Sequence, residues 1–229
     1  MAAEPQASRR PGRPRHSEPS PEFRARMTEI VETAARVFRA KGYDAGSLDD
    51  VATELDLRKA SLYYYVRSKA ELLYRVFDRA ITTALGSIEA SLEIEDPRER
   101  LASLICHQAV TVAAEPSFFS VFFDQRPRLA AAYEAEIRAK ERHYLHVFAD
   151  AVAAAVEQGA LVDVEPRYGA QAILGMTSWV YKWFDPDRDD PDEFARTCVA
   201  LVLPGPPGLD GAPGARRREP TPSAHAGHR

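Results

Sequence analysis

The chain has 229 residues, of which 45% are hydrophobic and 28% are charged. This composition predicts a folded protein with a sizeable apolar core and excludes a disordered or fibrous chain. Two cysteines are too few for a disulfide framework, and no apolar run approaches the ~20 residues that cross a bilayer. The N-terminus is charged and rich in proline, unlike a secretory signal. We therefore expect a cytoplasmic protein that does not enter a membrane.

Charge is unevenly distributed along the chain, whose net charge is −4. Residues 1–80 hold 15 Lys and Arg against 12 Asp and Glu, whereas residues 81–229 hold 15 against 22. A basic N-terminal part indicates a polyanionic partner there if a recognition motif supports it.

Both ends of the chain have compositions typical of disordered segments. Residues 1–21 contain five prolines, and residues 204–229 contain six prolines and five glycines. Between them, apolar residues recur with helical spacing, and no alternating pattern indicates a strand. We predict an all-α fold of about nine helices, with a three-helix domain over residues 22–67 and a larger bundle over residues 68–203.

Three helices are predicted at the start of the folded region. Apolar residues spaced by three and four predict a helix from Pro21 to Lys41, which Gly42 ends. Ser47 caps a second helix that stops near Asp56, and a third runs from Lys59 to Val66.

The second and third of these helices fit a helix-turn-helix unit. A turn of three or four residues joins them, and the small side chain of Ala52 lets them pack closely. Ser47 and Lys69 begin the flanking helices, where free backbone N–H groups attract phosphate. The side chains predicted to face a duplex from the third helix are Lys59, Ser61, Tyr64 and Tyr65.

The segment from Leu57 to Leu73, LRKASLYYYVRSKAELL, resembles the signature of the TetR family of bacterial transcription regulators, and FRAKGY at 38–43 matches as well. This resemblance covers about residues 25–75. It implies a homodimer whose N-terminal domains bind two half-sites of double-stranded operator DNA and whose C-terminal helices form a ligand cavity and the dimer interface. It also implies base contacts from Lys59, Ala60 and Ser61, a base or backbone contact from Tyr63, and phosphate contacts from Ser47, Tyr64, Tyr65 and Lys69.

Two residues depart from the family pattern. Asp56 replaces the usual glycine of the turn, and Asp tolerates a left-handed conformation better than most residues. Arg58 replaces the usual Ser or Thr cap, a loss of about 1 kcal/mol in helix stability. We hypothesise that Arg58 contacts the DNA backbone or a base.

A short basic arm precedes the first helix. Gly12-Arg13-Pro14 flanked by arginines is similar to an AT-hook, which enters a narrow A·T minor groove. A solubilising basic tail is the alternative interpretation. The arm residues concerned are Arg9, Arg10, Arg13 and Arg15.

The predicted helix over residues 165–184 is apolar nearly all round, so it must be buried on more than one side. Packing of this helix and the helix Asp190 to Leu203 against a symmetry mate would bury it. The predicted dimer-interface residues are Ile173, Met176, Val180, Trp183, Phe194 and Val199.

Aromatic residues cluster in the C-terminal half and are candidates for an apolar cavity, although core packing alone would account for most of them. The segment Leu174 to Phe184 resembles the C-terminal helix of TetR-family regulators of fatty-acid and sterol acyl-CoA catabolism. This resemblance implies a small hydrophobic effector, with an acyl-CoA as one candidate. The predicted pocket residues are His107, Phe118, Phe119, Phe122, Phe123, Tyr144, Phe148 and Trp179, with Arg126 or Arg142 for an anionic head group.

Catalytic and metal-binding patterns are weak. His143 and His146 share a helix face without a supporting acidic ligand, and the adjacent Cys106 and His107 cannot face each other on a helix. No phosphate loop, dinucleotide fingerprint or nucleophile elbow is found.

We expect that the protein is not an enzyme and binds no cofactor or metal. We predict a bacterial repressor that is associated with the nucleoid when bound to DNA and is released from DNA by its effector. The alternatives are an architectural DNA-binding protein with low sequence specificity and a helical-bundle enzyme or carrier.

Overall fold

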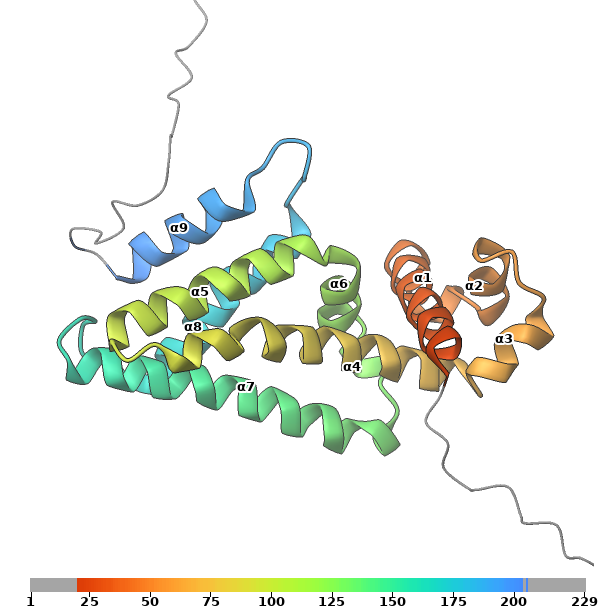
Figure 1. The fold of residues 1–229 in the computed structure, drawn as a ribbon, viewed down its shortest axis with the longest axis horizontal. Coiled ribbons are helices and arrows are strands. Elements are labelled where there is room, and N and C mark those ends of the chain that lie inside the picture. The colour runs from red at the N-terminus through yellow and green to blue at the C-terminus, as the bar shows by residue number, and fades with distance from the viewer. Residues whose placement is uncertain (1–19, 204, 206–229) are drawn as a thin grey trace, which may run out of the picture.

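The computed structural model describes residues 20–203 and 205, and within this part of the chain the ordered elements are all helices (Figure 1). The prediction of an all-α fold is confirmed. The elements are α1 (Pro21–Ala45), α2 (Leu48–Glu54), α3 (Lys59–Tyr65), α4 (Lys69–Ile88), α5 (Pro97–Ala114), α6 (Pro116–Asp124), α7 (Ala131–Glu157), α8 (Pro166–Ser178) and α9 (Pro191–Val202), with 3₁₀ helices at Glu89–Glu93, Arg126–Arg128 and Trp179–Lys182. The arm residues Arg9, Arg10, Arg13 and Arg15 lie outside the described residues.

The helices form a small cluster and a larger bundle. Figure 1 shows α1, α2 and α3 together at one end of an elongated molecule, and α4 running from this end into the bundle. In the bundle α4, α5, α7 and α8 lie side by side, and α9 packs along α5 (Figure 1). The short α6 packs against both α1 and α4, so it bridges the two parts.

Local capping signals fix most of the helix starts. Ser68 accepts a hydrogen bond from the backbone N–H of Glu71 (3.1 Å), and Asp96 accepts one from Glu99 (2.9 Å). Asp190 accepts from the N–H groups of Asp192 and Glu193. These side chains satisfy N–H groups that the first helical turn leaves without partners.

The three N-terminal helices share one apolar core. Ile30 and Phe38 of α1, Val51 of α2 and Leu62 of α3 are fully buried and belong to the same cluster. The helical path of α1 breaks at Gly42, where φ is 75° and ψ is 161°. This conformation is accessible almost only to glycine, so the predicted helix end at this residue is confirmed.

The predicted helix over residues 165–184 is shorter than expected. Its α-helical part ends at Ser178, and a 3₁₀ helix carries the chain from Trp179 to Lys182. The tighter 3₁₀ winding changes the directions of the side chains that follow. None of the described helices is both long enough and apolar enough to cross a membrane.

Candidate nucleic-acid interface and effector cavity

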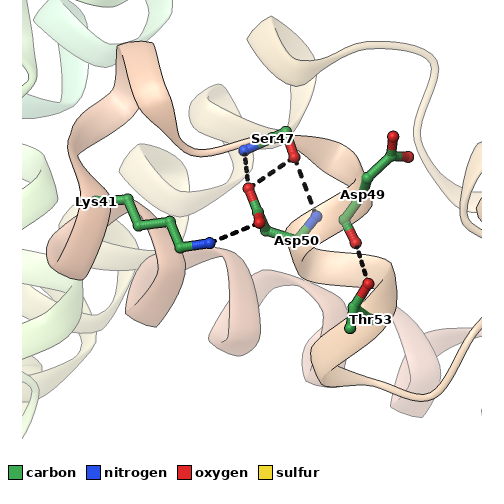
Figure 2. Close-up of polar contacts among 5 residues, drawn as sticks. All are labelled: Lys41, Ser47, Asp49, Asp50 and Thr53. Atoms are coloured by element: carbon green, nitrogen blue, oxygen red, sulfur yellow. Dashed lines mark hydrogen bonds and ion pairs between the residues drawn. The ribbon is translucent and has the colours of Figure 1, made fainter.

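The start of α2 is held by a reciprocal pair of side chains, shown in Figure 2. Oγ of Ser47 accepts the backbone N–H of Asp50 (3.1 Å), and Oδ2 of Asp50 accepts both the backbone N–H (2.8 Å) and the hydroxyl (2.7 Å) of Ser47. Asp50 therefore completes a capping box in which Glu or Gln is more usual. Because the Ser47 hydroxyl already donates to Asp50, the predicted phosphate contact from Ser47 would require this bond to break.

Asp50 is also the partner of a cation from α1. Nζ of Lys41 lies 2.6 Å from Oδ1 of Asp50 (Figure 2). The hydrogen bonds from Lys41, and next from Ser47, lower the pKa of Asp50 to about 2. The pair thus joins the end of α1 to the start of α2 as a charged contact.

The turn between α2 and α3 adopts the left-handed conformation that the sequence allowed. Asp56 has a φ of 53°, and the N–H of Leu57 donates to the carbonyl of Ala52 (2.8 Å). Arg58 follows as the residue before α3, and its side chain makes no capping hydrogen bond. Its exposed guanidinium is therefore available to an external anion.

The outer face of α3 is open to solvent, as a reading helix requires. Leu62 is fully buried, whereas Lys59, Ala60, Ser61, Tyr63 and Tyr64 are exposed. Nζ of Lys59 forms an ion pair of 2.7 Å with Oδ2 of Asp49 on α2. This hydrogen bond raises the pKa of Lys59. The predicted base contact from Lys59 would require its amino group to leave Asp49.

Phe23, near the start of α1, supports the tyrosines of α3, and the sequence patterns did not single it out. Its ring centroid lies 5.0 Å from that of Tyr65 and 5.9 Å from that of Tyr64. Tyr65 is consequently half-buried, while Tyr64 remains 74% exposed. The first turn of α1 therefore lies directly beside the reading helix.

Lys69, at the start of α4, is held by the end of α1. Its amino group lies 4.3 Å from the centre of the Tyr43 ring and donates to the carbonyl oxygen of Asp44 (3.2 Å). These contacts place a cation at a helix N-terminus beside α3, a position suited to a phosphate.

The regulatory bundle contains a cavity of about 200 Å³. Four of the residues predicted for a pocket lie on its wall, namely Phe119, Phe122, Phe123 and Tyr144. The sequence missed the other lining residues: Ile81, Ala84, Gln108, Glu141, Leu174 and Ser178. Of these, Gln108 carried a visible signal, because it is a polar amide within the apolar face of α5.

Six predicted pocket residues lie elsewhere. Phe118 and Phe148 are buried in the surrounding core. His107 is exposed and bonds through Nδ1 to Ser91 (2.9 Å), and Arg142 and Trp179 also face solvent. Arg126 does not line the cavity, but its Nη2 holds the carboxylate of Glu141, which does (2.7 Å).

Polar groups occupy two places in the cavity wall. The Tyr144 hydroxyl donates to Oε1 of Gln108 (2.5 Å), and Nε2 of Gln108 donates to Oγ of Ser178 (3.1 Å). Glu141 is the second polar group in the wall. Burial raises its pKa, and the positive charge of Arg126 opposes this effect. Burial also raises the pKa of Tyr144, so its hydroxyl stays protonated. The cavity is thus apolar with a small number of fixed polar groups, which is typical of a ligand site.

The surface of α8, α9 and the 3₁₀ helix between them carries exposed apolar side chains. Trp183 is 48% exposed and its ring packs edge-on against Phe194 at 5.2 Å between centroids. Leu201 is 70% exposed. Met176, Phe194 and Val199 are partly buried, but Ile173 and Val180 point into the protomer core, so they cannot contact a partner as predicted.

The helix α6 connects the cavity to the DNA-binding helices. It contributes Phe119, Phe122 and Phe123 to the cavity wall. At its two ends, the hydroxyl of Ser117 accepts from Arg39 (3.4 Å) and Oε1 of Gln125 accepts the N–H of Tyr43 (3.3 Å). A movement of the cavity wall therefore has a direct route to the end of α1.

Comparisons with known proteins agree with this architecture. Residues 30–76 match the family described as bacterial regulatory proteins, tetR family, and residues 95–205 match the tetracyclin repressor-like C-terminal domain. The chain is 24% identical over 190 residues to the HTH-type transcriptional repressor KstR2 of Rhodococcus jostii, covering 79% of this chain and 90% of KstR2.

Solved structures extend the similarity to the whole fold. The crystal structure of AibR in complex with isovaleryl coenzyme A and operator DNA has a TM-score of 0.73 and 28% identity, covering 78% of this chain and 98% of AibR. PfmR of Thermus thermophilus, a TetR family regulator, has a TM-score of 0.72 and 31% identity, covering 77% of this chain and 97% of PfmR. The chain belongs to the TetR family of transcriptional regulators, which bind DNA through an N-terminal helix-turn-helix.

Proposed function

We propose that this chain is a homodimeric repressor that binds its operator through α3 of each protomer and is released by a short acyl thioester bound in the bundle cavity. The observation that carries the proposal is the position of α6, which forms part of the cavity wall and also bonds to α1. One short helix thus shares its contacts between a small-molecule site and a DNA-reading domain. A DNA-binding enzyme or a purely architectural protein would not require this connection.

Operator recognition is assigned to the exposed side of α3 and its flanks. Lys59, Ala60 and Ser61 would meet base edges, and Tyr63, Tyr64 and Tyr65 would position the helix against bases or phosphates. Arg58 and Lys69 would add phosphate contacts on either side. Phe23 places the first turn of α1 beside α3, so the start of α1 would also lie close to the bound duplex.

Dimerisation is assigned to the apolar surface of α8 and α9. A two-helix contribution from each protomer would bury Trp183 and Leu201, which are exposed in the single chain, together with Met176, Phe194 and Val199. A dimer of this kind would present two copies of α3 to half-sites one turn of duplex apart, about 34–36 Å.

The volume and chemistry of the cavity support the proposed effector class. Pockets for drug-sized ligands measure about 300–1,000 Å³. A cavity of about 200 Å³ instead suits a short branched acyl group, and a coenzyme A moiety would have to lie outside it. The AibR structure, whose ligand is isovaleryl coenzyme A, supports this choice over a bulky sterol-derived group.

The test is fluorescence anisotropy of the full chain on its own upstream intergenic DNA and on a scrambled duplex at about 150 mM salt, with and without isovaleryl coenzyme A. We expect a preference of about 10³ or more for the specific duplex, and release by the thioester. Equal binding to both duplexes would favour an architectural role. Turnover of the thioester by the pure protein would favour an enzyme.

A further inference from the structure

We propose that the cavity recognises a neutral carbonyl oxygen of its ligand through hydrogen bonds from the Gln108, Tyr144 and Ser178 cluster, and so selects an acyl thioester or ketone over a hydrocarbon or a free carboxylate. This inference rests on the proposed function, because it specifies the chemistry of the effector in the same cavity. It depends on the hydrogen-bonding capacity of the three side chains.

The cluster has more donors than its own acceptors use. The two hydroxyls carry one hydrogen each and the Gln108 amide carries two, whereas the structure shows two bonds among the three residues. Two donor hydrogens are therefore left over. If the amide were turned by 180°, the hydroxyl left without an acceptor would be that of Tyr144 instead of Ser178, and the surplus would again be two donors.

The residues that carry the surplus donors line the cavity. All three residues line the cavity, and Gln108 is 3% exposed to solvent. A buried donor without an acceptor is unfavourable, so a ligand that supplies an acceptor binds more tightly than one that does not. A carbonyl oxygen has two lone pairs and can accept both hydrogens.

The second polar place in the wall selects against a negative ligand. Glu141 lines the cavity, whereas Arg126, which pairs with it, does not. None of the residues that line the cavity is basic, and Glu141 is already paired with Arg126, so a ligand carboxylate would be buried there without a counter-ion. A thioester or ketone oxygen has no net charge and avoids this cost.

The geometry also connects recognition to the fold of the bundle. Gln108 lies on α5, Tyr144 on α7, and Ser178 is the last residue of α8. Phe119 and Phe122 of α6 line the same cavity and would provide apolar contacts for the alkyl part of the ligand. A ligand with both parts would contact four helices at once.

The experiment compares two coenzyme A compounds that differ at one atom group. Isothermal titration calorimetry of the full chain would use isovaleryl coenzyme A and its thioether, S-(3-methylbutyl) coenzyme A, in which CH₂ replaces C=O. We expect the thioester to bind about tenfold more tightly, since the thioether loses two neutral hydrogen bonds and each contributes roughly threefold in affinity. Free isovalerate should bind more weakly than the thioester.

Two variants locate the effect. Ser178→Ala leaves both surplus hydrogens on the Gln108 amide nitrogen, where they diverge and one carbonyl oxygen can accept only one of them, so the preference for the thioester should fall to about threefold while thioether affinity stays unchanged. Ser87→Ala is the matched control, because the Ser87 hydroxyl bonds to the carbonyl of Ala84 within α4 and does not line the cavity. Circular dichroism of both variants checks the fold.

Three results would overturn the inference: equal affinity for thioester and thioether, isovalerate binding as tightly as the thioester, or no binding of either coenzyme A compound. Fluorescence anisotropy of operator binding by the same protein distinguishes failure of this inference from failure of the proposed function. If the thioether releases the specifically bound operator as well as the thioester does, the carbonyl preference is wrong but the proposed repressor function stands. Absence of specific operator binding removes the proposed function itself.

Discussion

The backbone N–H of Tyr43 donates a hydrogen bond of 3.3 Å to Oε1 of Gln125. Tyr43 follows the break in α1, and Gln125 directly follows α6. The bond therefore joins the DNA-binding helices to the helix that carries the aromatic wall of the cavity. An effector that displaces α6 would act on α1 through this contact.

Gln125→Ala should weaken the coupling between effector and operator. Coupling free energies of about 1–3 kcal/mol are typical, and the loss of one contact should lower the effector-induced change in operator affinity several-fold. Effector affinity without DNA should change less than twofold. Anisotropy and calorimetry measure the two quantities. Gln158→Ala is the control, because Gln158 directly follows α7 and bonds to Asp96, far along the chain from α1. An unchanged release by the Gln125 variant would exclude this route.

Asp49→Asn should strengthen operator binding. The substitution frees the Lys59 amino group, now 2.7 Å from Asp49, and removes a negative charge beside α3. An exposed ion pair contributes about 0–1 kcal/mol, so we expect up to about fivefold tighter binding at 150 mM salt. Salt titration by anisotropy provides the measurement. Lys59→Ala should weaken binding. If Asp49→Asn weakened it too, Asp49 would instead be holding Lys59 in its reading position.

The Asp50 carboxylate should make stability depend on pH in the acid range. Its folded pKa of about 2 lies below its ordinary value of 3.8, so its contribution is complete above about pH 4. The contribution is lost as pH falls toward 2. The difference in unfolding free energy between the native chain and Asp50→Asn should therefore shrink over this range, as urea titrations at several pH values would show. A constant difference would mean that Lys41 and Ser47 do not stabilise the charged form.

Gly42→Ala should destabilise the protein by about 1–3 kcal/mol, because an L side chain is strained at φ 75° and ψ 161°. No atom lies within 4 Å of the added Cβ, so the cost is conformational and not steric. Gly86→Ala is the matched control, since its Cβ also meets no atom but its backbone is helical. That variant should be more stable by about 0.5–1 kcal/mol. Thermal unfolding of both variants tests the contrast.

Trp183→Arg should shift the chain toward monomer by placing a charge in the proposed interface between the α8 and α9 surfaces. Light scattering with size-exclusion chromatography measures the mass, and operator affinity should fall because paired half-sites require a dimer. Leu92→Arg is the control, since Leu92 is 44% exposed in the 3₁₀ helix after α4. A dimeric Trp183 variant would place the interface elsewhere.

The N-terminal domain was largely predictable because its determinants are local. The capping residues Ser47 and Ser68, the helix-breaking Gly42 and the left-handed Asp56 each act within a few residues of their position. Periodic apolar residues then fixed which faces are buried. The packing of Phe23 against Tyr64 was not predicted, because these residues lie more than 40 positions apart in the sequence.

The cavity was only partly predictable because its wall comes from several helices. Phe119 and Phe122 could be proposed from their cluster, but Gln108 and Ser178 meet only in the folded bundle. The helix α8 posed a different problem, since an all-round apolar helix does not reveal which side faces a partner. The change to 3₁₀ winding after Ser178 directs Val180 inward and Trp179 outward, against the predicted interface and pocket.

The double role of α6 also limits how the protein can change over evolutionary time. A substitution at Phe119 or Phe122 that admits a different ligand alters the same nine-residue helix on which the DNA-binding end rests. Under the proposed function, ligand selectivity and the resting level of repression are therefore coupled. A new specificity acquired at this wall should require a compensating change where α6 meets α1, around Arg39 and Tyr43.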